Sequence, residues 1–337
     1  MLVQQDESEW ETVQLEVSSP EWTLPQVKEI LAISDTSLLD RLISDLRSAR
    51  MAEYTGPGCA YPVKRVLSIS DNVAHGLFKS REHCGGINMS EFTGKTVLIT
   101  GAGRGIGRQV ALDFGAEGAN VCVNYAHSAA EAEKVVAKIE GSGGNAIACK
   151  ADIVDSGQVK AMIDSTLDAF GSIDILINNA GLSIDGPFLD MAEADWDRVC
   201  GVNLKGPFLV SQAVARHMIA GDGGIIVNIS ATTTTQGRPN AANYCSSKAG
   251  LNMLTKCMAL ELGPSVRVNG LGLGFVDSPL VREIYSEDQI AQVIEGTPLR
   301  RMTTMKETAS FIKLLASDST SFVTGQTIMF DGGRNMR

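Results

Sequence analysis

The feature that most restricts the fold of this chain is a glycine-rich turn at residues 101–107, which follows a short apolar run and opens a helical pattern. Glycine lets a backbone turn tightly and approach a diphosphate closely, and the positive end of the following helix stabilises the charge of that ligand. The turn alone is a weak signal, because a strand-to-helix loop without a ligand can have the same pattern. It predicts a strand–turn–helix unit and raises the hypothesis of a nucleotide site.

From Thr96 onward, short apolar runs alternate with longer amphipathic segments, which is typical of a parallel sheet covered by helices on both faces. The predicted strands are residues 97–100, 121–124, 146–149, 173–177, 224–229, 266–271 and 327–330. The predicted helices lie near residues 105–117, 129–141, 156–170, 192–220, 242–262 and 305–316. We therefore expect an α/β domain of Rossmann type over residues 89–337, with a doubly wound, seven-stranded parallel sheet.

Residues 1–88 lack this alternation, and we expect them to form a small, mainly helical N-terminal extension. Helical patterns cover residues 24–31 and 36–51, and a strand pattern covers residues 63–69 after a Gly/Pro turn. The outline also fits a winged-helix-like module, but residues 1–90 hold 13 acidic and 8 basic side chains, which argues against DNA binding. A docking or oligomerisation element is the favoured interpretation, with a partner protein as its target.

The composition excludes several classes of partner. The formal charge of -10, from 39 acidic and 29 basic residues, would repel nucleic acid and anionic lipid. No segment approaches the roughly 18 apolar residues of a membrane span, and the acidic start of the chain does not resemble a signal peptide. The seven cysteines are scattered, which predicts reduced thiols in a cytoplasmic protein. No metal site is predicted, because Cys59, His75, His83 and Cys84 lack the paired spacing of zinc ligands.

Two further motifs fall where a sheet of this kind binds its ligands. Residues 178–181, with the sequence Asn-Asn-Ala-Gly, follow the fourth predicted strand, while Tyr244 and Lys248 lie at the start of a predicted helix. A Tyr and a Lys four positions apart share one helix face. The ammonium can lower the phenol pKa from its usual value of about 10, which would make Tyr244 a proton donor or acceptor near neutral pH.

Together these motifs resemble the short-chain dehydrogenase/reductase family, in its compact form with a TGxxxGxG turn. The resemblance covers residues 94 to about 333. It includes the glycine turn, Asp152, residues 178–181, 202–204, the YxxxK pair, 266–269, 323–326 and 331–333. So many ordered matches imply an NAD(P)-dependent oxidoreductase that acts on CH–OH or C=O groups.

The resemblance also implies roles for matching residues. Tyr244 would be the general acid/base, Lys248 would hold the nicotinamide ribose and tune Tyr244, and Asn203 would support a water in the proton relay. The predicted cofactor-binding residues are Gly101, Gly103, Arg104, Gly105, Ile106, Gly107, Tyr125, His127, Ser128, Asp152, Ile153, Asn179, Ala180, Gly181, Tyr244, Lys248, Gly274, Val276 and Ser278.

The chain departs from the family pattern at the oxyanion partner. The family's Ser lies thirteen residues before its Tyr, and that position is Ala231. Three interpretations stay open: a neighbouring hydroxyl of Ser230 or Thr232 takes the role, Tyr244 acts alone on a substrate polarised by conjugation, or the protein binds cofactor without efficient turnover. A missing donor would cost roughly 10²–10³ in rate. We favour a neighbouring hydroxyl, with Thr232 and Ser230 as equal candidates.

A second departure follows the sixth predicted strand. Leu273 stands where the family has the proline of a Pro-Gly pair, which should leave that bend less rigid, whereas Gly274 is retained. Ser278 matches a position that contacts the nicotinamide amide or phosphate. Residues 279–298 are predicted to form a mobile substrate lid.

The end of the second predicted strand indicates which cofactor is preferred. NAD enzymes of this fold place a carboxylate there, whereas this chain has Tyr125 and no carboxylate until Glu131. Arg104, with His127 and Ser128, could instead bind a 2′-phosphate. NADPH is therefore favoured, and the stretch around Tyr125 also resembles that of 3-oxoacyl-acyl-carrier-protein reductases.

The leading hypothesis is an NADPH-dependent reductase of a ketone, either a 3-oxoacyl thioester or a biosynthetic intermediate, with Tyr244 as proton donor. The alternatives are a non-catalytic cofactor-sensing or scaffold protein, motivated by Ala231, and an NAD-dependent alcohol dehydrogenase. The helices near 192–220 and 242–262 correspond to those through which the family builds dimers and tetramers. A homodimer or homotetramer is expected, with residues 1–88 available to dock a carrier or a partner enzyme.

Overall fold

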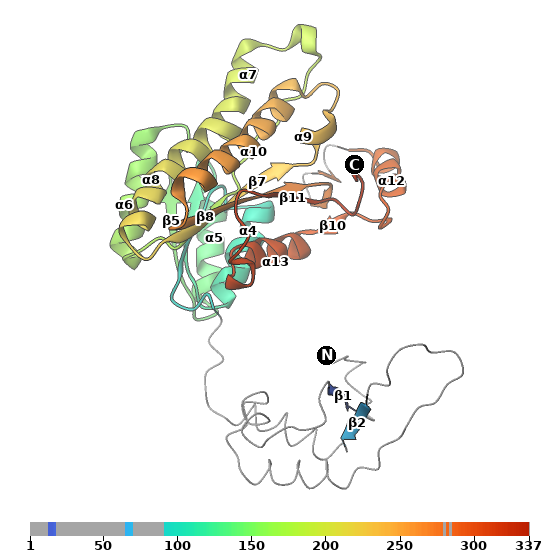
Figure 1. The fold of residues 1–337 in the computed structure, drawn as a ribbon. Coiled ribbons are helices and arrows are strands. Elements are labelled where there is room, and N and C mark those ends of the chain that lie inside the picture. The colour runs from blue at the N-terminus through green and yellow to red at the C-terminus, as the bar shows by residue number, and fades with distance from the viewer. Residues whose placement is uncertain (1–12, 18–64, 70–90, 279–280, 283–284, 337) are drawn as a thin grey trace, which may run out of the picture. The chain divides into compact units, whose positions relative to one another are not determined.

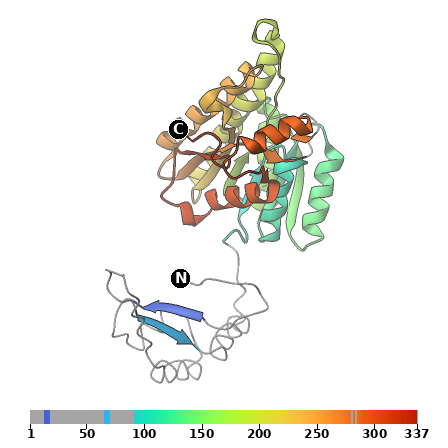
Figure 2. The same ribbon diagram turned by 90° about the vertical axis from the view of Figure 1, so that its right-hand side faces the viewer.

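The computed structural model describes residues 13–17, 65–69, 91–278, 281–282 and 285–336. The chain divides into two compact units, Met1–Asn88 and Met89–Arg337. In the first unit, β1 (Val13–Val17) and β2 (Arg65–Ile69) run antiparallel (Figure 2). The strand β2 lies within the strand predicted at residues 63–69.

The other predictions for residues 1–88 fall outside the described residues. They concern the helices at 24–31 and 36–51 and the side chains of Cys59, His75, His83 and Cys84. The mainly helical character of this unit and its docking role stay predictions.

The second unit is built on a seven-stranded parallel sheet with the strand order β11-β8-β7-β6-β3-β4-β5. Figure 1 shows this sheet between layers of helices. Its strands are β3 (Thr96–Ile99), β4 (Asn120–Tyr125), β5 (Asn145–Lys150), β6 (Ile175–Asn178), β7 (Gly224–Ala231), β8 (Val266–Leu273) and β11 (Thr327–Phe330). The predicted doubly wound sheet is confirmed, and each predicted strand overlaps an observed one.

Helices cover both faces of this sheet. On one face lie α4 (Gly105–Ala116), α5 (Ala129–Glu140) and α13 (Met305–Leu315); on the other lie α6 (Ser156–Phe170), α8 (Gly206–Ala220) and α10 (Ala242–Leu262). Successive strand residues enter opposite cores: Val97 and Ile99 pack in the first, and Leu98 packs in the second. Because both faces are buried, the strands are apolar throughout rather than alternating.

The helix predicted near residues 192–220 is interrupted. α7 (Glu193–Cys200) leads into a π-helical turn, η2 (Gly201–Lys205), and only then into α8. A π turn adds a residue to the helical repeat and often marks a functional position. Here the turn contains Asn203, one of the predicted catalytic residues.

The remaining elements lie beyond the sheet's carboxyl edge or at the C-terminal end of the chain. They are η1 (Phe188–Asp190), α9 (Thr233–Gln236), β9 (Val276–Asp277), α12 (Glu287–Glu295), β10 (Thr303–Thr304) and η3 (Asp318–Thr320). The predicted lid contains α12, which starts in a capping box formed by Ser286 and Gln289. Among the described residues, no helix combines the length and the apolar character needed to cross a membrane.

Candidate active site

Two motifs that are distant in sequence meet where the strand order reverses. β3 and β6 are neighbours, although the chain visits β4 and β5 between them, so their carboxyl ends form a crevice of the kind that binds ligands. Thr100 Oγ1 accepts hydrogen bonds from the backbone N–H groups of Asn179 and Ala180, both at 3.0 Å. In return, Asn179 Nδ2 donates to the carbonyl oxygens of Thr100 at 2.9 Å and Gly101 at 3.2 Å. The glycine turn and the Asn-Asn-Ala-Gly segment are thus fixed to each other.

The start of α4 offers its amide groups to the crevice. The N-cap Arg104 makes no side-chain capping bond, and the first turn of α4 contains no acidic residue. Gly101 and Gly105 have φ angles of 64° and 57°, a conformation that favours glycine. A positive helix end with open N–H groups and no side chain in the way fits a diphosphate.

A cleft of about 1620 Å³ extends from this turn along the carboxyl edge. Most of the predicted cofactor-binding residues line it: Gly101, Gly103, Arg104, Gly105, Ile106, Tyr125, His127, Ser128, Asp152, Ile153, Asn179, Ala180, Gly181 and Ser278. The residues present fit a nicotinamide dinucleotide, which when bound would supply the hydride for the reaction at a carbonyl carbon.

Five predicted cofactor residues do not line this cleft. Two of them, Tyr244 and Lys248, are described below, and the other three have structural contacts instead. A Cβ on Gly107 would lie 2.6 Å from the Gly101 carbonyl oxygen and 2.5 Å from Asn179 Nδ2, so this glycine permits close packing beneath the turn. Gly274 donates its N–H to the carbonyl of Phe330 at 3.1 Å. Val276 is buried in the short strand β9.

Leu273, which stands at the family's proline position, was expected to leave the bend less rigid. The structure shows a different effect. Leu273 continues β8 and lies opposite both Ala231 and Phe330 in the sheet. Its carbonyl also accepts a hydrogen bond from Thr232 N at 3.0 Å. A proline at this position would fix φ and remove a donor, so the leucine allows the strand to extend.

One structural contributor to the cleft, Asn124, was not predicted. Its Oδ1 accepts from Gly101 N at 3.2 Å, and its Nδ2 donates to the carbonyls of Cys149 and Ala151 at 3.2 and 3.1 Å. It therefore ties the glycine turn to β4 and to the end of β5. The available signal was an amide side chain in an otherwise apolar strand.

Lys248 and Asn203 meet beside Gly181. A Cβ on Gly181 would lie 3.5 Å from both Lys248 Nζ and Asn203 Oδ1, so the glycine leaves room between them. The amide of Asn203 is held by both backbone groups of Leu182, each at 2.8 Å, and donates to Ser247 Oγ at 3.1 Å. The π turn η2 thus places a fixed polar group next to the lysine.

The electrostatics of the Tyr–Lys pair differ from the prediction. Burial raises the pKa of Tyr244 to about 12, against the opposing influence of the Arg238 guanidinium. Burial also lowers the pKa of Lys248 to about 8, and its ammonium donates to the Ile229 carbonyl at 2.7 Å. The expected lowering of the phenol pKa by Lys248 is absent here because burial dominates. Tyr244 is therefore a neutral phenol at pH 7, which suits a proton donor.

The hydroxyl groups around Ala231 differ in whether they already have a hydrogen-bond partner. Ser230 Oγ donates to Asn252 Oδ1 at 2.5 Å and lies 3.4 Å from the Lys248 carbonyl, so it is engaged with α10. Thr232 is buried and its hydroxyl makes no hydrogen bond within the described residues. Thr233, which was not predicted, has a buried hydroxyl oxygen with no partner among the described residues. This arrangement favours Thr232 over Ser230 as the replacement donor and adds Thr233 as a candidate.

The buried Lys248 should make stability depend on pH. Its pKa is about 8 in the folded protein and about 10.4 in an unfolded chain, so the unfolded chain binds more protons between these values. The free energy of unfolding should then rise with pH in that window, by on the order of 2 kcal/mol between pH 7 and pH 10 relative to Lys248→Met. Urea unfolding curves of both proteins at several pH values measure this difference. If the difference in the free energy of unfolding between the two proteins stayed constant across this pH range, the lowered pKa of Lys248 would be contradicted.

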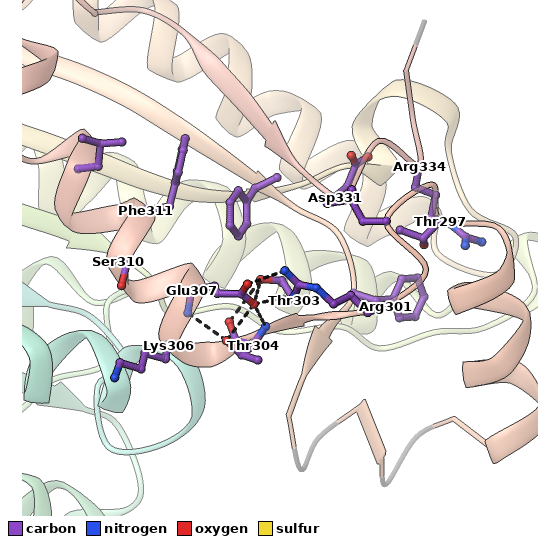
Figure 3. Close-up of a pocket in the computed structure, with 15 residues that line it drawn as sticks. Thr297, Arg301, Thr303, Thr304, Lys306, Glu307, Ser310, Phe311, Asp331 and Arg334 are labelled. Atoms are coloured by element: carbon purple, nitrogen blue, oxygen red, sulfur yellow. Dashed lines mark hydrogen bonds and ion pairs between the residues drawn. The ribbon is translucent and has the colours of Figure 1, made fainter. Parts of the chain in front are cut away.

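A second cavity of about 610 Å³ lies between α13 and the C-terminal segment (Figure 3). Phe311 and Phe330 stack in its wall with ring centroids 4.9 Å apart, and Arg301 forms two hydrogen bonds to the Glu307 carboxylate at 2.6 and 2.8 Å. None of the predicted site residues lines it. Within the described ranges there is also no group of three or more His, Cys, Asp or Glu side chains that could hold a metal.

Known proteins share this sequence pattern. The family model described as enoyl-(acyl carrier protein) reductase matches residues 101–335. The chain is 40% identical over 243 residues to a 3-oxoacyl-acyl-carrier-protein reductase from Staphylococcus epidermidis, covering 72% of this chain and 99% of the relative. It is 39% identical over 250 residues to the reductase of the same name from Synechocystis, covering 74% and 100%.

Solved structures share the fold. A short-chain type dehydrogenase/reductase from Mycobacterium marinum is 36% identical, with a TM-score of 0.70 over 74% of this chain and 98% of that one. A gluconate 5-dehydrogenase from Burkholderia cenocepacia, solved with NADP and tartrate, is 34% identical, with a TM-score of 0.69 over 73% and 98%.

The fold, the site and these relatives define an oxidoreductase that acts on CH–OH or C=O groups with a nicotinamide cofactor. The chain belongs to the short-chain dehydrogenase/reductase family, and among its relatives are 3-oxoacyl-acyl-carrier-protein reductases. Because the relatives named above are oxidoreductases, the alternative of a non-catalytic sensor or scaffold is not favoured.

Proposed function

We propose that this protein is an NADPH-dependent ketoreductase whose substrate is a 3-oxoacyl thioester, in free or carrier-bound form. The observation that carries the proposal is the meeting of Lys248 and Asn203 at Gly181, one helical turn from Tyr244 and at the edge of a glycine-lined cleft. The similarity to 3-oxoacyl reductases over nearly their whole length supports the choice of substrate class.

In the proposed reaction, the bound carbonyl receives a hydride on carbon and a proton on oxygen. Tyr244 gives the proton, since its neutral phenol is the dominant form at working pH. Lys248 and Asn203 then return a proton to Tyr244 from solvent. Thr232 or Thr233 supplies the hydroxyl that the family's Ser would provide at Ala231.

NADPH is proposed over NADH because of the side chains that line the cleft at the end of β4. Tyr125 ends that strand, and Arg104, His127 and Ser128 line the cleft beside it. Ser128 makes no side-chain capping bond to α5, so its hydroxyl is available to a ligand. The nearby Glu131 carboxylate is paired with Lys134 at 2.7 Å. A guanidinium and a hydroxyl without a competing carboxylate suit a 2′-phosphate.

Arg104→Ala should therefore weaken NADPH selectively. A lost charge-assisted bond of about 1.5–3 kcal/mol corresponds to roughly a 10- to 100-fold higher KM for NADPH. The KM for NADH should change less than threefold, since NADH has no 2′-phosphate. Steady-state kinetics with both cofactors measure the ratio, and Arg108→Ala, on an exposed position of the same helix, is the matched control. An equal effect on both cofactors would reject the 2′-phosphate contact.

The substrate proposal is tested by following NADPH oxidation with an acetoacetyl thioester, a crotonyl thioester and a simple cyclic ketone. We expect the acetoacetyl thioester to have the highest kcat/KM of the three. Turnover of the crotonyl thioester alone would instead indicate a conjugated C=C bond as the substrate. Preference for the simple ketone with NADH would favour the NAD-dependent alcohol dehydrogenase.

Assembly and location complete the proposal. We propose a homodimer or homotetramer in the cytoplasm, formed through α8 and α10. In support, these helices expose Phe208, Ile219, Met253 and Leu260, with Leu260 83% exposed. Residues 1–88 are proposed to dock an acyl carrier or a partner enzyme. Sedimentation of the full chain tests the first point, and carrier binding with and without residues 1–88 tests the second.

A further inference from the structure

The missing hydroxyl at Ala231 raises the question of what else supports Tyr244 during proton transfer. When a phenol gives up its proton in a partly buried site, the negative charge that forms must be stabilised. Lys248 aims its ammonium at the Ile229 carbonyl, at 2.7 Å. A second cation, Arg238, lies in the segment between the end of β7 and the start of α10.

The guanidinium of Arg238 lies against the ring of Tyr244, with its central carbon 5.9 Å from the ring centroid. At this separation an arginine and an aromatic ring attract each other. The guanidinium is always charged, whereas burial lowers the pKa of Lys248 to about 8. Above that pH, Arg238 is the cation of the two that keeps its charge.

The position of Arg238 is fixed by an ion pair rather than left to a flexible side chain. Its two terminal nitrogens donate to the two carboxylate oxygens of Asp185 at 2.5 and 2.9 Å, and one also donates to Ser183 Oγ at 3.3 Å. Ser183 Oγ in turn donates to Asp185 at 2.7 Å. Such a two-point pair fixes the plane of the guanidinium.

Two hydrogen bonds join the two loops that carry this pair. Gly186 N donates to the Asn240 carbonyl at 2.8 Å, and Asn243 Nδ2 donates to the Ile184 carbonyl at 2.9 Å. The segment after β6 and the segment before α10 therefore form one wall beside Tyr244. That wall was not predicted, because its charges come from loops without a motif.

The charges around Tyr244 act in opposite directions. Burial raises its pKa most, and the guanidinium of Arg238 lowers it. Cys245, Tyr285 and Asp185 raise it further, while Lys248 follows one turn later on the same helix. The Arg238–Asp185 pair thus places one charge of each sign near the phenol.

We propose that Arg238 is a positioning residue for Tyr244: its guanidinium, held by Asp185, stabilises the tyrosinate that remains after proton transfer. The inference rests on the proposed role of Tyr244 as the proton donor. In reduction, the carbonyl carbon gains a hydride, its oxygen gains the phenol proton, and tyrosinate and oxidised cofactor remain. In oxidation, the tyrosinate takes the hydroxyl proton while the cofactor takes the hydride.

The test is the pH profile of kcat/KM for oxidation of a 3-hydroxybutanoyl thioester at saturating NADP⁺. Tyr244 must be deprotonated in this reaction, and the positive nicotinamide beside it should bring its pKa below the value of about 12 in the free protein. Arg238→Gln should move the acid limb of the profile upward by about one pH unit, because a cation near the phenol is lost. Asp185→Asn should move it downward, because it removes the opposing anion but keeps a polar partner for Arg238. Arg238→Lys should restore most of the wild-type position.

The acid limbs of Arg238→Gln and Asp185→Asn should shift in opposite directions. A damaged loop would lower the activity of both variants without such opposite shifts, so the result separates an electrostatic role from a structural one. Thermal melting confirms that each variant folds. If Arg238→Gln is too slow for a profile, those of Arg238→Lys and Asp185→Asn decide. An unshifted profile of Arg238→Gln or Asp185→Asn, or shifts of the same sign in these two variants, would overturn the inference while leaving the proposed function intact. An active Tyr244→Phe would instead remove the proposed function itself.

Discussion

Tyr244→Phe is expected to lower kcat by about 10²–10⁴-fold, the usual contribution of a general acid. The change removes only the hydroxyl, so the ring keeps its contact with Arg238. The phenol is neutral at pH 7 because burial raises its pKa to about 12, and the phenylalanine ring is neutral as well. Cofactor binding should therefore change less than threefold. Stopped-flow rates of NADPH oxidation and fluorescence titration with NADPH measure the two quantities.

Tyr285→Phe is the matched control for this variant. Tyr285 carries a second phenol near Tyr244 and packs edge-on against Phe275, with ring centroids 5.3 Å apart. Loss of its hydroxyl should change kcat by less than tenfold. Comparable losses in both variants would mean that the pocket needs two phenols for shape or solvation, and that Tyr244 is not the specific proton donor.

Gly107→Ala is the second change with a large expected effect, and it acts through packing. The new methyl group would lie 2.6 Å from the Gly101 carbonyl oxygen and 2.5 Å from Asn179 Nδ2. The helix start and the glycine turn must move apart to admit it. We expect the free energy of unfolding to fall by about 1–3 kcal/mol, as for other overpacked sites. NADPH affinity should fall roughly 10- to 100-fold, because the amides of the turn shift.

Gly103→Ala is the control that separates loss of stability from loss of NADPH affinity. Its methyl group would meet the nearest protein atom, Ala132 N, at an ordinary 3.5 Å, yet the residue lines the cleft. This variant should lose cofactor affinity with little change in urea unfolding, whereas Gly107→Ala should lose both. Normal stability in Gly107→Ala would show that the turn absorbs the methyl group without strain.

The sheet and the position of the candidate cofactor cleft were predictable because they follow from local patterns. Apolar runs buried on both faces specify the strands, and the glycines near Gly101 specify a turn that another residue could not make without strain. The spacing of Tyr244 and Lys248 also predicted that they share a helix. These features need no knowledge of distant contacts.

Other properties depended on the folded environment. Whether Lys248 lowers the pKa of Tyr244 is decided by burial and by the direction of the ammonium, which no spacing encodes. The engagement of Ser230 by Asn252 depends on a helix that starts twelve residues later. Arg238 and Asp185 are 53 positions apart, and only the meeting of their two loops makes them a pair.

The hydrogen bonds between Asn179 and the glycine turn link two parts of the candidate site. Asn179 holds the carbonyls of Thr100 and Gly101, and two residues later the same segment reaches Gly181, beside Lys248 and Asn203. Under the proposed function, the turn that would bind the diphosphate and the groups that would handle the proton are therefore held by one continuous hydrogen-bonded segment.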